Sequence, residues 1–317
     1  MKFLFTATIA TLAGFVAATP TPVFKRATPE DSCDIGYAST NGGTTGGAGG
    51  TTTTVSSLDE LTAAAEGDEK KIIMVSGSIS GSGTVRVGAN TSILGQSGAS
   101  ITGASIFIKG VSNVIVRNLK LSKVEGGDCI GVQEATNVWL DHLDISGDLE
   151  VDKDFYDGLL DITHAGDYIT VSNSHFHDHW KASLVGHSDS NADEDTGTLR
   201  VTYANNKWIN INSRTPSIRF GTAHIYNNYY ETISTSGVNT RMGAVVLVES
   251  STFVDAKRAI TSIDSDIEGT AAVNDVDLGG STNDAPVGSL EVPYEYTLVG
   301  SASAKSSTES SGATLTF

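Results

Sequence analysis

The sequence predicts an all-β fold, a single-domain parallel β-helix, because one strand-like pattern recurs along most of the chain. Six segments share alternating apolar residues that end in a polar corner, namely residues 114–118, 138–142, 169–173, 201–205, 223–227 and 246–250. Their last residues are spaced by 24, 31, 32, 22 and 23 positions. Val, Ile and Tyr in alternation favour strands, and the intervening Gly, Asn, Ser and Asp favour turns. A period of this length is typical of a solenoid whose coils stack on one another.

Two other repeat architectures do not fit these residues. Leucine-rich repeats need a leucine consensus that the segments lack, and propeller blades need repeats of about 40–50 residues. An asparagine recurs at the corner of several repeats, as in Asn118, Asn173, Asn205 and Asn227. Because asparagine tolerates a left-handed backbone, we expect these side chains to stack in a ladder along the coils.

The open end of a solenoid has to be covered, and the segment before the repeats offers a cap. Ser57 followed by Glu60 is a capping-box pattern, which predicts a short N-terminal capping helix from Ser57 to about Ala65. The Gly/Thr-rich run 42–54 before it is expected to be an ordered loop. The Ser/Ala-rich residues 301–312 are expected to be an extended strap or a frayed tail.

The N-terminus predicts export. Residues 1–18 read as a signal peptide, because a lysine precedes an apolar stretch that is too short to span a bilayer and ends in small residues. Residues 19–26 end in Lys25-Arg26, which we interpret as the end of a propeptide rather than an ordinary exposed pair. Residues 27–317 would then form the whole secreted protein, with no second domain. A monomer is the default expectation, because a β-helix buries its own core.

The composition of the chain restricts the classes of partner that it can bind. The chain has 20 basic and 37 acidic residues, a net charge of -17, and 39% apolar residues, which excludes wholesale disorder. Such acidity argues against nucleic acid or an anionic membrane as a partner. Cys33 and Cys129 are too few for a disulfide scaffold or a cysteine-based zinc site, but in an oxidising compartment they could pair or stay free. Asn90 begins a glycosylation sequon.

Three aspartates are candidate ligands for a metal ion. Asp157 and Asp161 would lie about 13 Å apart on a straight strand. Gly158 permits a turn that would bring both inward, and coil stacking at about 4.8 Å would place Asp128 beside them. Three neighbouring carboxylates repel unless a cation sits among them, and oxygen ligands favour Ca²⁺. A solvated acidic face is the alternative that the spacing leaves open.

Basic residues are scarce in so acidic a chain. Arg214 and Arg219 flank a proline-stiffened turn, and Lys181 is a lone basic residue one repeat earlier. Near a metal ion they would form a cationic patch suited to a polyanion. Surface salt bridges, worth about 0–1 kcal/mol each, are the alternative.

Two short motifs carry a resemblance to a known family. The run WLDH at 139–142 and the segment RTPSIR at 214–219, with the spaced aspartates and the repeat, resemble the family-1 polysaccharide lyases. These are pectate lyases and pectin lyases on a right-handed parallel β-helix. The resemblance covers residues 36–255. Each motif is specific, and the two in this order are more so.

The resemblance implies a cofactor and its ligands. Ca²⁺ would be bound by Asp128, Asp157 and Asp161, which match the primary site of the pectate lyase branch. Pectin lyases replace part of this site with basic residues and work without the metal, so the three retained acids favour the pectate branch. Some relatives carry a further acid where this chain has Gly126, so any additional Ca²⁺ would be bound differently.

The resemblance also implies the catalytic groups. Arg214 matches the proposed base, and Lys181 and Arg219 match residues that hold the carboxylates of the substrate. Because a guanidinium is normally protonated, the assignment of Arg214 follows from the resemblance, and a rate that rises into the alkaline range is expected. A structural cluster near the site is matched by Trp139, Asp141 and His142, so His142 is not expected to act as a base.

The implied activity is β-elimination in (1,4)-α-D-galacturonan, the polygalacturonate of plant cell walls, to give 4,5-unsaturated oligogalacturonides. Three alternatives remain. A pectin lyase would act on methyl-esterified chains without a metal. A β-helix glycoside hydrolase would use paired carboxylates. In a non-catalytic wall-binding solenoid, loss of Arg214 would leave the behaviour of the substrate unchanged.

Overall fold

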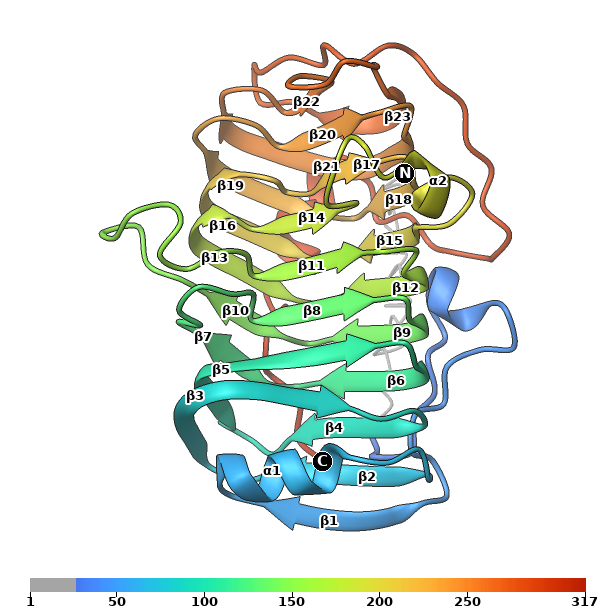
Figure 1. Ribbon diagram of the computed structural model, residues 1–317. Coiled ribbons are helices and arrows are strands. Elements are labelled where there is room, and N and C mark those ends of the chain that lie inside the picture. The colour runs from blue at the N-terminus through green and yellow to red at the C-terminus, as the bar shows by residue number, and fades with distance from the viewer. Residues whose placement is uncertain (1–26) are drawn as a thin grey trace, which may run out of the picture.

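A computed structural model of the chain describes residues 27–317, so the predicted signal peptide and propeptide lie outside the described residues. In this part the 23 strands pair in parallel and stack as coils (Figure 1). The predicted all-β parallel β-helix is therefore confirmed. No helix in the described part is long and apolar enough to cross a membrane.

Each complete coil contributes a strand or part of a strand to each of three sheets, which we call the first, second and third sheet in the order in which the chain enters them. The first sheet contains β1 (Thr51–Val55), β2 (Lys71–Val75), β4 (Thr91–Gly95), β6 (Ser112–Arg117), β9 (Thr136–Asp141), β12 (Asp167–Ser172), β15 (Arg200–Ala204), β18 (Thr222–Tyr226), the first half of β21 (Val245–Ala256) and β23 (Thr270–Asp277). The second sheet contains the first parts of β3 (Ser78–Val87) and β5 (Ser100–Lys109), then β7 (Lys120–Ser122), β10 (Asp144–Ser146), β13 (His175–Lys181), β16 (Lys207–Ser213), β19 (Tyr229–Ile233) and the end of β21. The third sheet contains the later parts of β3 and β5, then β8 (Ile130–Gln133), β11 (Leu160–Thr163), β14 (Ser183–Val185), β17 (Ser217–Arg219), β20 (Val238–Arg241) and β22 (Ile260–Thr261).

The six segments of the sequence pattern all fall in the first sheet. Their first residues pair in one column, in the order Val114, Val138, Ile169, Val201, Ala223 and Val246. Each of these side chains is buried in the core. The spacing of the pattern therefore equals the length of one coil.

The corner after the first sheet has the predicted left-handed backbone. Asn118, Asn173, Asn205 and Asn227 have φ of 58°, 49°, 57° and 55°. The side chain of Asn227 donates from Nδ2 to Oδ1 of Asn205 at 3.0 Å. Asparagine adopts the left-handed backbone of these corners at lower cost than most residues, and its side chain can bridge neighbouring coils.

An aromatic column fills the core behind the second sheet. Phe176, Trp208, Tyr230 and Phe253 pair in register on four successive coils and are fully buried. The rings stack with centroids 4.2 Å apart for Phe176 and Trp208 and 4.1 Å apart for Tyr230 and Phe253. Such stacking adds to the stabilisation from burial alone.

Helices are short and lie outside the coils. The predicted cap is α1 (Leu58–Ala65), in which Ser57 accepts a hydrogen bond from the Glu60 amide and Leu61 is buried against the core. The other helical elements are η1 (Tyr37–Ser39), α2 (Ala192–Asp195), η2 (Ser301–Ser303) and α3 (Ala304–Ser307). The capping helix is confirmed, with the range that its capping box predicts.

Two terminal segments differ from the expectation. The run 42–54 is only partly a loop, because Thr51–Val55 is strand β1, paired with β2. Its threonines are exposed, so no apolar alternation marks them. The C-terminal residues form η2 and α3 and then a strap, residues 310–317, whose Leu315 amide donates to Asn118 Oδ1 at 2.8 Å. The strap returns from the C-terminal coils toward the N-terminal ones (Figure 1).

Of the two alternatives that the sequence leaves open for the cysteines, the structure shows free thiols and no disulfide. Cys33 and Cys129 are both free and buried. Cys129 points into the main core between the sheets, whereas Cys33 packs beside Trp139 under the N-terminal segment. The two thiols therefore lie on opposite sides of a sheet.

Candidate active site

The candidate site lies where the coils turn from the second sheet into the third. Backbone hydrogen bonds hold four of these turns in one stack. The Cys129 amide donates to the Gly158 carbonyl at 3.2 Å, the Leu159 amide to the Ala182 carbonyl at 2.9 Å, and the Ser183 amide to the Arg214 carbonyl at 2.8 Å. Residues 128, 157, 181 and 214, far apart in sequence, are therefore neighbours in space.

Asp128 and Asp161 converge over Gly158. A Cβ atom at position 158 would lie 2.6 Å from Asp128 Oδ1 and 2.9 Å from Asp161 Oδ1, so only glycine leaves room for both carboxylates. Asp161 Oδ1 accepts a hydrogen bond from the Leu184 amide at 3.0 Å. Asp128 Oδ1 is buried and has no hydrogen-bond partner among the described residues. The spacing predicts that Gly158 turns Asp157 and Asp161 inward together, whereas in the structure this glycine leaves room for Asp128 and Asp161.

The two carboxyl groups are costly to ionise where they lie. Burial, with the nearby charge of Asp157, raises the pKa of Asp128 to about 6, although Arg214 and Lys181 oppose the shift. Burial and the charge of Asp128 raise the pKa of Asp161 well above its usual value. A buried acceptor without a partner, beside a second carboxylate, is the environment that a cation would relieve. The donor set therefore fits a hard cation such as Ca²⁺.

Asp157 is oriented differently from the other two acids. Its Oδ1 lies 2.7 Å from Nζ of Lys181, which also lies 2.8 Å from Asp154 Oδ1. The three predicted ligands consequently do not make a compact cluster of oxygens in the described part of the chain. The structure brings Asp128 and Asp161 together and leaves Asp157 at their edge, paired with Lys181.

Arg214 has a left-handed backbone, and its guanidinium makes no polar contact with the described chain. Its φ is 63°, an uncommon value for a residue other than glycine. Between residues 27 and 317, no hydrogen bond or salt bridge involves its guanidinium. The charge of Arg214 lowers the pKa values of Asp128 and Asp161, so it lies within electrostatic reach of both. The residue is held in place by its backbone and remains available for a ligand.

Arg219 lies one strand further on and is already paired. Its Nε atom donates to Asp189 Oδ1, and Nη1 donates to the Gly186 carbonyl at 2.8 Å. Arg241 is its register partner on β20 and also contacts Asp189, at 3.3 Å. A substrate carboxylate would therefore have to compete with Asp189 for Arg219.

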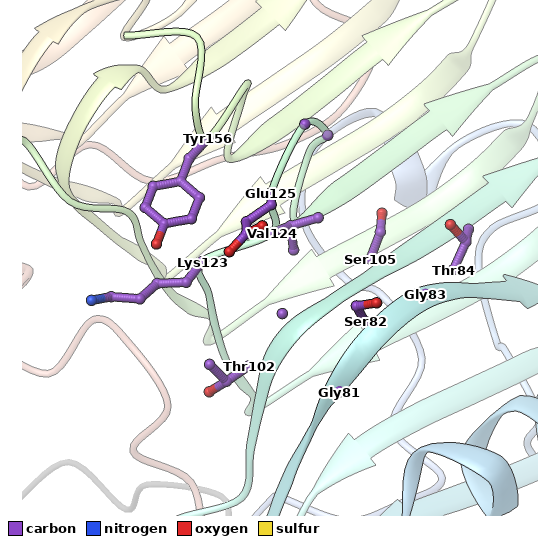
Figure 2. Close-up of a pocket in the computed structure, with 13 residues that line it drawn as sticks. Gly81, Ser82, Gly83, Thr84, Thr102, Ser105, Lys123, Val124, Glu125 and Tyr156 are labelled. Carbon is purple, nitrogen blue, oxygen red and sulfur yellow. The ribbon is translucent and has the colours of Figure 1, made fainter. Parts of the chain in front are cut away.

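A pocket of about 720 Å³ lies between β3, β5 and residues 123–127. Its lining includes Gly127 and Tyr156, the chain neighbours of Asp128 and Asp157, but none of the three aspartates. Figure 2 shows Lys123 and Tyr156 on one side and Ser82, Thr84 and Ser105 on the other. A pocket lined mainly by glycines and hydroxyl groups suits a hydrophilic ligand rather than an apolar one.

Comparison with known proteins agrees with this geometry. A family model described as pectate lyase matches residues 1–314. The chain belongs to the pectate lyase family. The family resemblance that the two motifs carried is thereby confirmed, and with it the prediction of a pectate lyase enzyme.

Relatives and solved structures of pectate lyases cover nearly the whole chain. Pectate lyase B of Colletotrichum gloeosporioides is 58% identical over 94% of this chain and 91% of that protein. Pectate lyase A of Emericella nidulans is 56% identical over 100% and 99%. The structure of a pectate lyase from Bacillus sp. N165 in complex with trigalacturonate has a TM-score of 0.80 at 31% identity, covering 88% of this chain and 98% of that one.

One predicted cluster of this pectate lyase lies elsewhere. Trp139 and Asp141 belong to β9 in the first sheet, and His142 follows them at the corner. Asp141 is fully buried and accepts hydrogen bonds from Arg117 at 2.6 Å and from Ser172 at 2.7 Å. No hydrogen bond, ion pair or ring contact within residues 27–317 joins this cluster to the three aspartates or to Arg214. The expected structural role fits, but the expected position near the site is corrected.

The charge of Asp141 explains why the cluster holds together. Burial opposes ionisation, but the hydrogen bond and charge of His142 and the charge of Arg117 outweigh it and lower the pKa of Asp141 to about 2. The Arg117 guanidinium also lies 4.7 Å from the centre of the Trp139 ring. The WLDH motif therefore stabilises the first sheet through a buried ion pair and a cation–π contact.

Three residues of the site were not identified from the sequence. Asp154 and Asp189 pair with Lys181 and Arg219, and Arg241 adds a further cation next to Arg219. Arg241 occupies the position of Arg219 one coil later, so counting coils from the RTPSIR segment would have found it. The two aspartates lie in irregular loops, where sequence spacing carries no such signal.

Proposed function

We propose that the protein is a Ca²⁺-dependent pectate lyase that cleaves de-esterified (1,4)-α-D-galacturonan by β-elimination. The observation that supports this most directly is the buried, unpartnered Asp128 Oδ1 beside Asp161, with the free guanidinium of Arg214 two coils after Asp161. The trigalacturonate in the related structure from Bacillus sp. N165 supports a galacturonate substrate.

Asp128 and Asp161 would hold the Ca²⁺ ion, and Asp157 would join them if Lys181 released it. When bound, the ion would neutralise a carboxylate of the substrate and stabilise the charge that develops on it.

The residues of the chain divide the remaining work. Arg214 acts in its neutral form, because a protonated guanidinium has no lone pair to offer, and accepts the C5 proton of the sugar next to the scissile bond. The electron pair of that C–H bond forms the C4=C5 double bond, and the C4–O bond breaks with its electrons on the departing sugar oxygen, which takes up a proton. Lys181 and Arg219 bind carboxylates of the substrate and orient it, after exchange with Asp154 and Asp189. No water is consumed, which distinguishes this reaction from hydrolysis.

The test is an assay on polygalacturonate with Ca²⁺ and then with a chelator, followed by the ultraviolet absorbance of the new double bond. We expect absorbance to rise only when Ca²⁺ is present. We also expect Asp161→Asn to need much more Ca²⁺ than the wild type, whereas Asp193→Asn, an exposed change of the same charge on α2, should behave normally. Full activity with chelator on methyl-esterified pectin would favour a pectin lyase, and new reducing ends without absorbance would favour a hydrolase.

We further propose that the enzyme is secreted after removal of residues 1–26 and acts as a monomer. Support comes from the N-terminal pattern and from a core that the coils bury by themselves. Modification of Asn90 is a separate proposal. Its side chain is half-buried and donates to the Asp68 carbonyl at 2.9 Å, so a glycan would project beside that loop. Mass spectrometry of the secreted protein tests the maturation site and the glycan together.

A further inference from the structure

A second group of metal-ligating side chains lies on the second sheet, away from the acidic residues of the candidate site. One ligand atom each from Asp144, His175 and His177 lies within 4.8 Å of the others. Asp144 on β10 pairs directly with His175 on β13, and His177 follows two positions later on the same face. The ladder therefore fixes the three side chains on adjacent coils about 4.8 Å apart.

His177 lies between two carboxylates. Its Nε2 is 2.9 Å from Asp144 Oδ1, and its Nδ1 is 2.7 Å from Asp178 Oδ2. A neutral imidazole carries one N–H, which can satisfy one of these acceptors and leaves a lone pair facing the other. Either a second proton or a cation must occupy the gap between His177 and Asp144. With Nδ1–H donated to Asp178, Nε2 would have the lone pair that binds a metal.

The surroundings orient these ligands. Asp178 also accepts a hydrogen bond from Asn210 Nδ2 at 2.6 Å, which fixes the carboxylate behind His177. The rings of His175 and His177 are stacked with centroids 4.3 Å apart. No group of the described chain hydrogen-bonds to the buried Nε2 atom of His175.

We propose that Asp144, His175 and His177 form a binding site for a divalent transition-metal ion, with Zn²⁺ as the expected occupant. Two imidazoles and one carboxylate are a ligand set that Zn²⁺ uses, with an open position for water. In a tetrahedral zinc site the ligand atoms lie about 3.3 Å apart, close to the separation of His177 Nε2 and Asp144 Oδ1.

Charge alone would not select an ion here. Lys120 pairs with Asp144 on the preceding coil, and Lys207 pairs with His175 on the following one. These lysines offset the charges of Asp144 and Asp178, so affinity has to come from the nitrogen ligands. That requirement favours Zn²⁺ or Cu²⁺ and disfavours Ca²⁺.

The C-terminal strap passes over this site. A Cβ atom at Gly312 would lie 3.4 Å from the Cβ of His175 and 4.0 Å from Asp144 Oδ2. The Gly312 amide also donates to the Asn173 carbonyl at 2.8 Å. A metal ion would therefore join β10 to β13 directly beneath the strap and stabilise the folded coils by mass action.

The test uses Zn²⁺ calorimetry and Cu²⁺ electron paramagnetic resonance on the full chain, with excess Ca²⁺ present. The wild type should bind one Zn²⁺, and bound Cu²⁺ should show nitrogen coupling. His177→Gln should weaken Zn²⁺ binding at least 10-fold and remove part of the nitrogen coupling. His177→Gln and its control variant are first checked for wild-type circular dichroism and melting without metal.

The matched control is His164→Gln. His164 stacks on His187 with centroids 4.0 Å apart and contacts Glu194 at 3.0 Å, but these residues do not form a three-ligand cluster in the described chain. Zn²⁺ binding should survive this change. The proposal fails if the wild type binds no Zn²⁺, if His177→Gln binds as tightly as the wild type, or if Asp157→Asn abolishes binding instead. None of these readouts depends on lyase activity, so they are separate from the test of the proposed function.

Discussion

The ammonium group of Lys181 lies 2.7 Å from the carboxylate of Asp157 and thereby joins a substrate-binding residue to a metal-ligand residue of the proposed site. Asp154 holds the same ammonium group at 2.8 Å. Lys181 is thus paired with two carboxylates before any substrate binds. A galacturonate carboxylate has to compete with these acids for the ammonium group.

Removal of Asp154 should therefore favour substrate binding. We expect Asp154→Asn to lower KM for polygalacturonate by about 2- to 5-fold with kcat nearly unchanged, the scale of one exposed ion pair. The effect should shrink as salt is added, because exposed pairs are screened. Asp193→Asn serves as the control for the general loss of negative charge. An unchanged or higher KM relative to that control would contradict the competition.

Loss of Arg214 should remove chemistry without removing stability. The guanidinium makes no hydrogen bond or salt bridge within residues 27–317, so Arg214→Gln should melt like the wild type. Its kcat should fall by about 10²- to 10⁴-fold, the usual contribution of a positioned base, while KM changes little. Lys257→Gln, at an exposed site, should retain full activity. A variant with substantial kcat would exclude Arg214 as the base.

The Asp141 cluster should matter for stability rather than catalysis. Asp141→Ala leaves the Arg117 guanidinium in a buried position without its closest acid, which should cost about 3–5 kcal/mol. Urea unfolding measures this loss, and Asp141→Asn, which keeps part of the hydrogen bonding, should lose less. Below its unfolding temperature, Asp141→Ala should keep the wild-type kcat. A wild-type urea midpoint would show that the cluster contributes no stability.

His224 should make stability depend on pH. Burial, only partly offset by Glu249, lowers the pKa of this ring to about 4, and the ring is fully buried. In the unfolded chain its pKa is about 6.5, so between about pH 6.5 and 4 the unfolded state binds the extra proton. Stability from this group is complete above pH 6.5 and falls as the pH drops toward 4.

Unfolding at pH 7 and pH 5 measures this dependence. In the wild type His224 should contribute up to about 1.4 kcal/mol per pH unit to the fall, and His224→Gln should reduce the slope by that amount. A proton titration of the native ring by nuclear magnetic resonance provides an independent measurement. Protonation of His224 above pH 6 in the native state would refute the prediction.

The first sheet was predictable because one coil repeats one local pattern. The spacing of Val114, Val138 and Ile169 equals the coil length, so residues that match in sequence become neighbours in register. The same stacking places Asp128 one coil before Gly158, and Asp161 approaches it from the coil of that glycine. Strand β1 was not predicted, because its threonines are exposed and its sequence shows no apolar alternation.

Pairings that depend on loop geometry were not predictable. Asp154 and Asp189 hold Lys181 and Arg219 from irregular loops, whose shape no period describes. Whether Cys33 pairs with Cys129 could not be decided from the sequence, because two cysteines in one chain say nothing about the side of a sheet on which each lies. Sequence spacing therefore gives the scaffold and its inward residues, and the ion pairs around the site require coordinates.

The C-terminal strap changes how such a stack can come apart. In a plain solenoid each rung touches only its neighbours, so the ends can unzip one rung at a time. Here Ser311 donates to the Asn205 carbonyl at 2.8 Å, and Leu315 contacts Asn118 several rungs earlier. The tail is hydrogen-bonded to corners in the middle of the stack, so the C-terminal coils cannot separate from the rest until these contacts break.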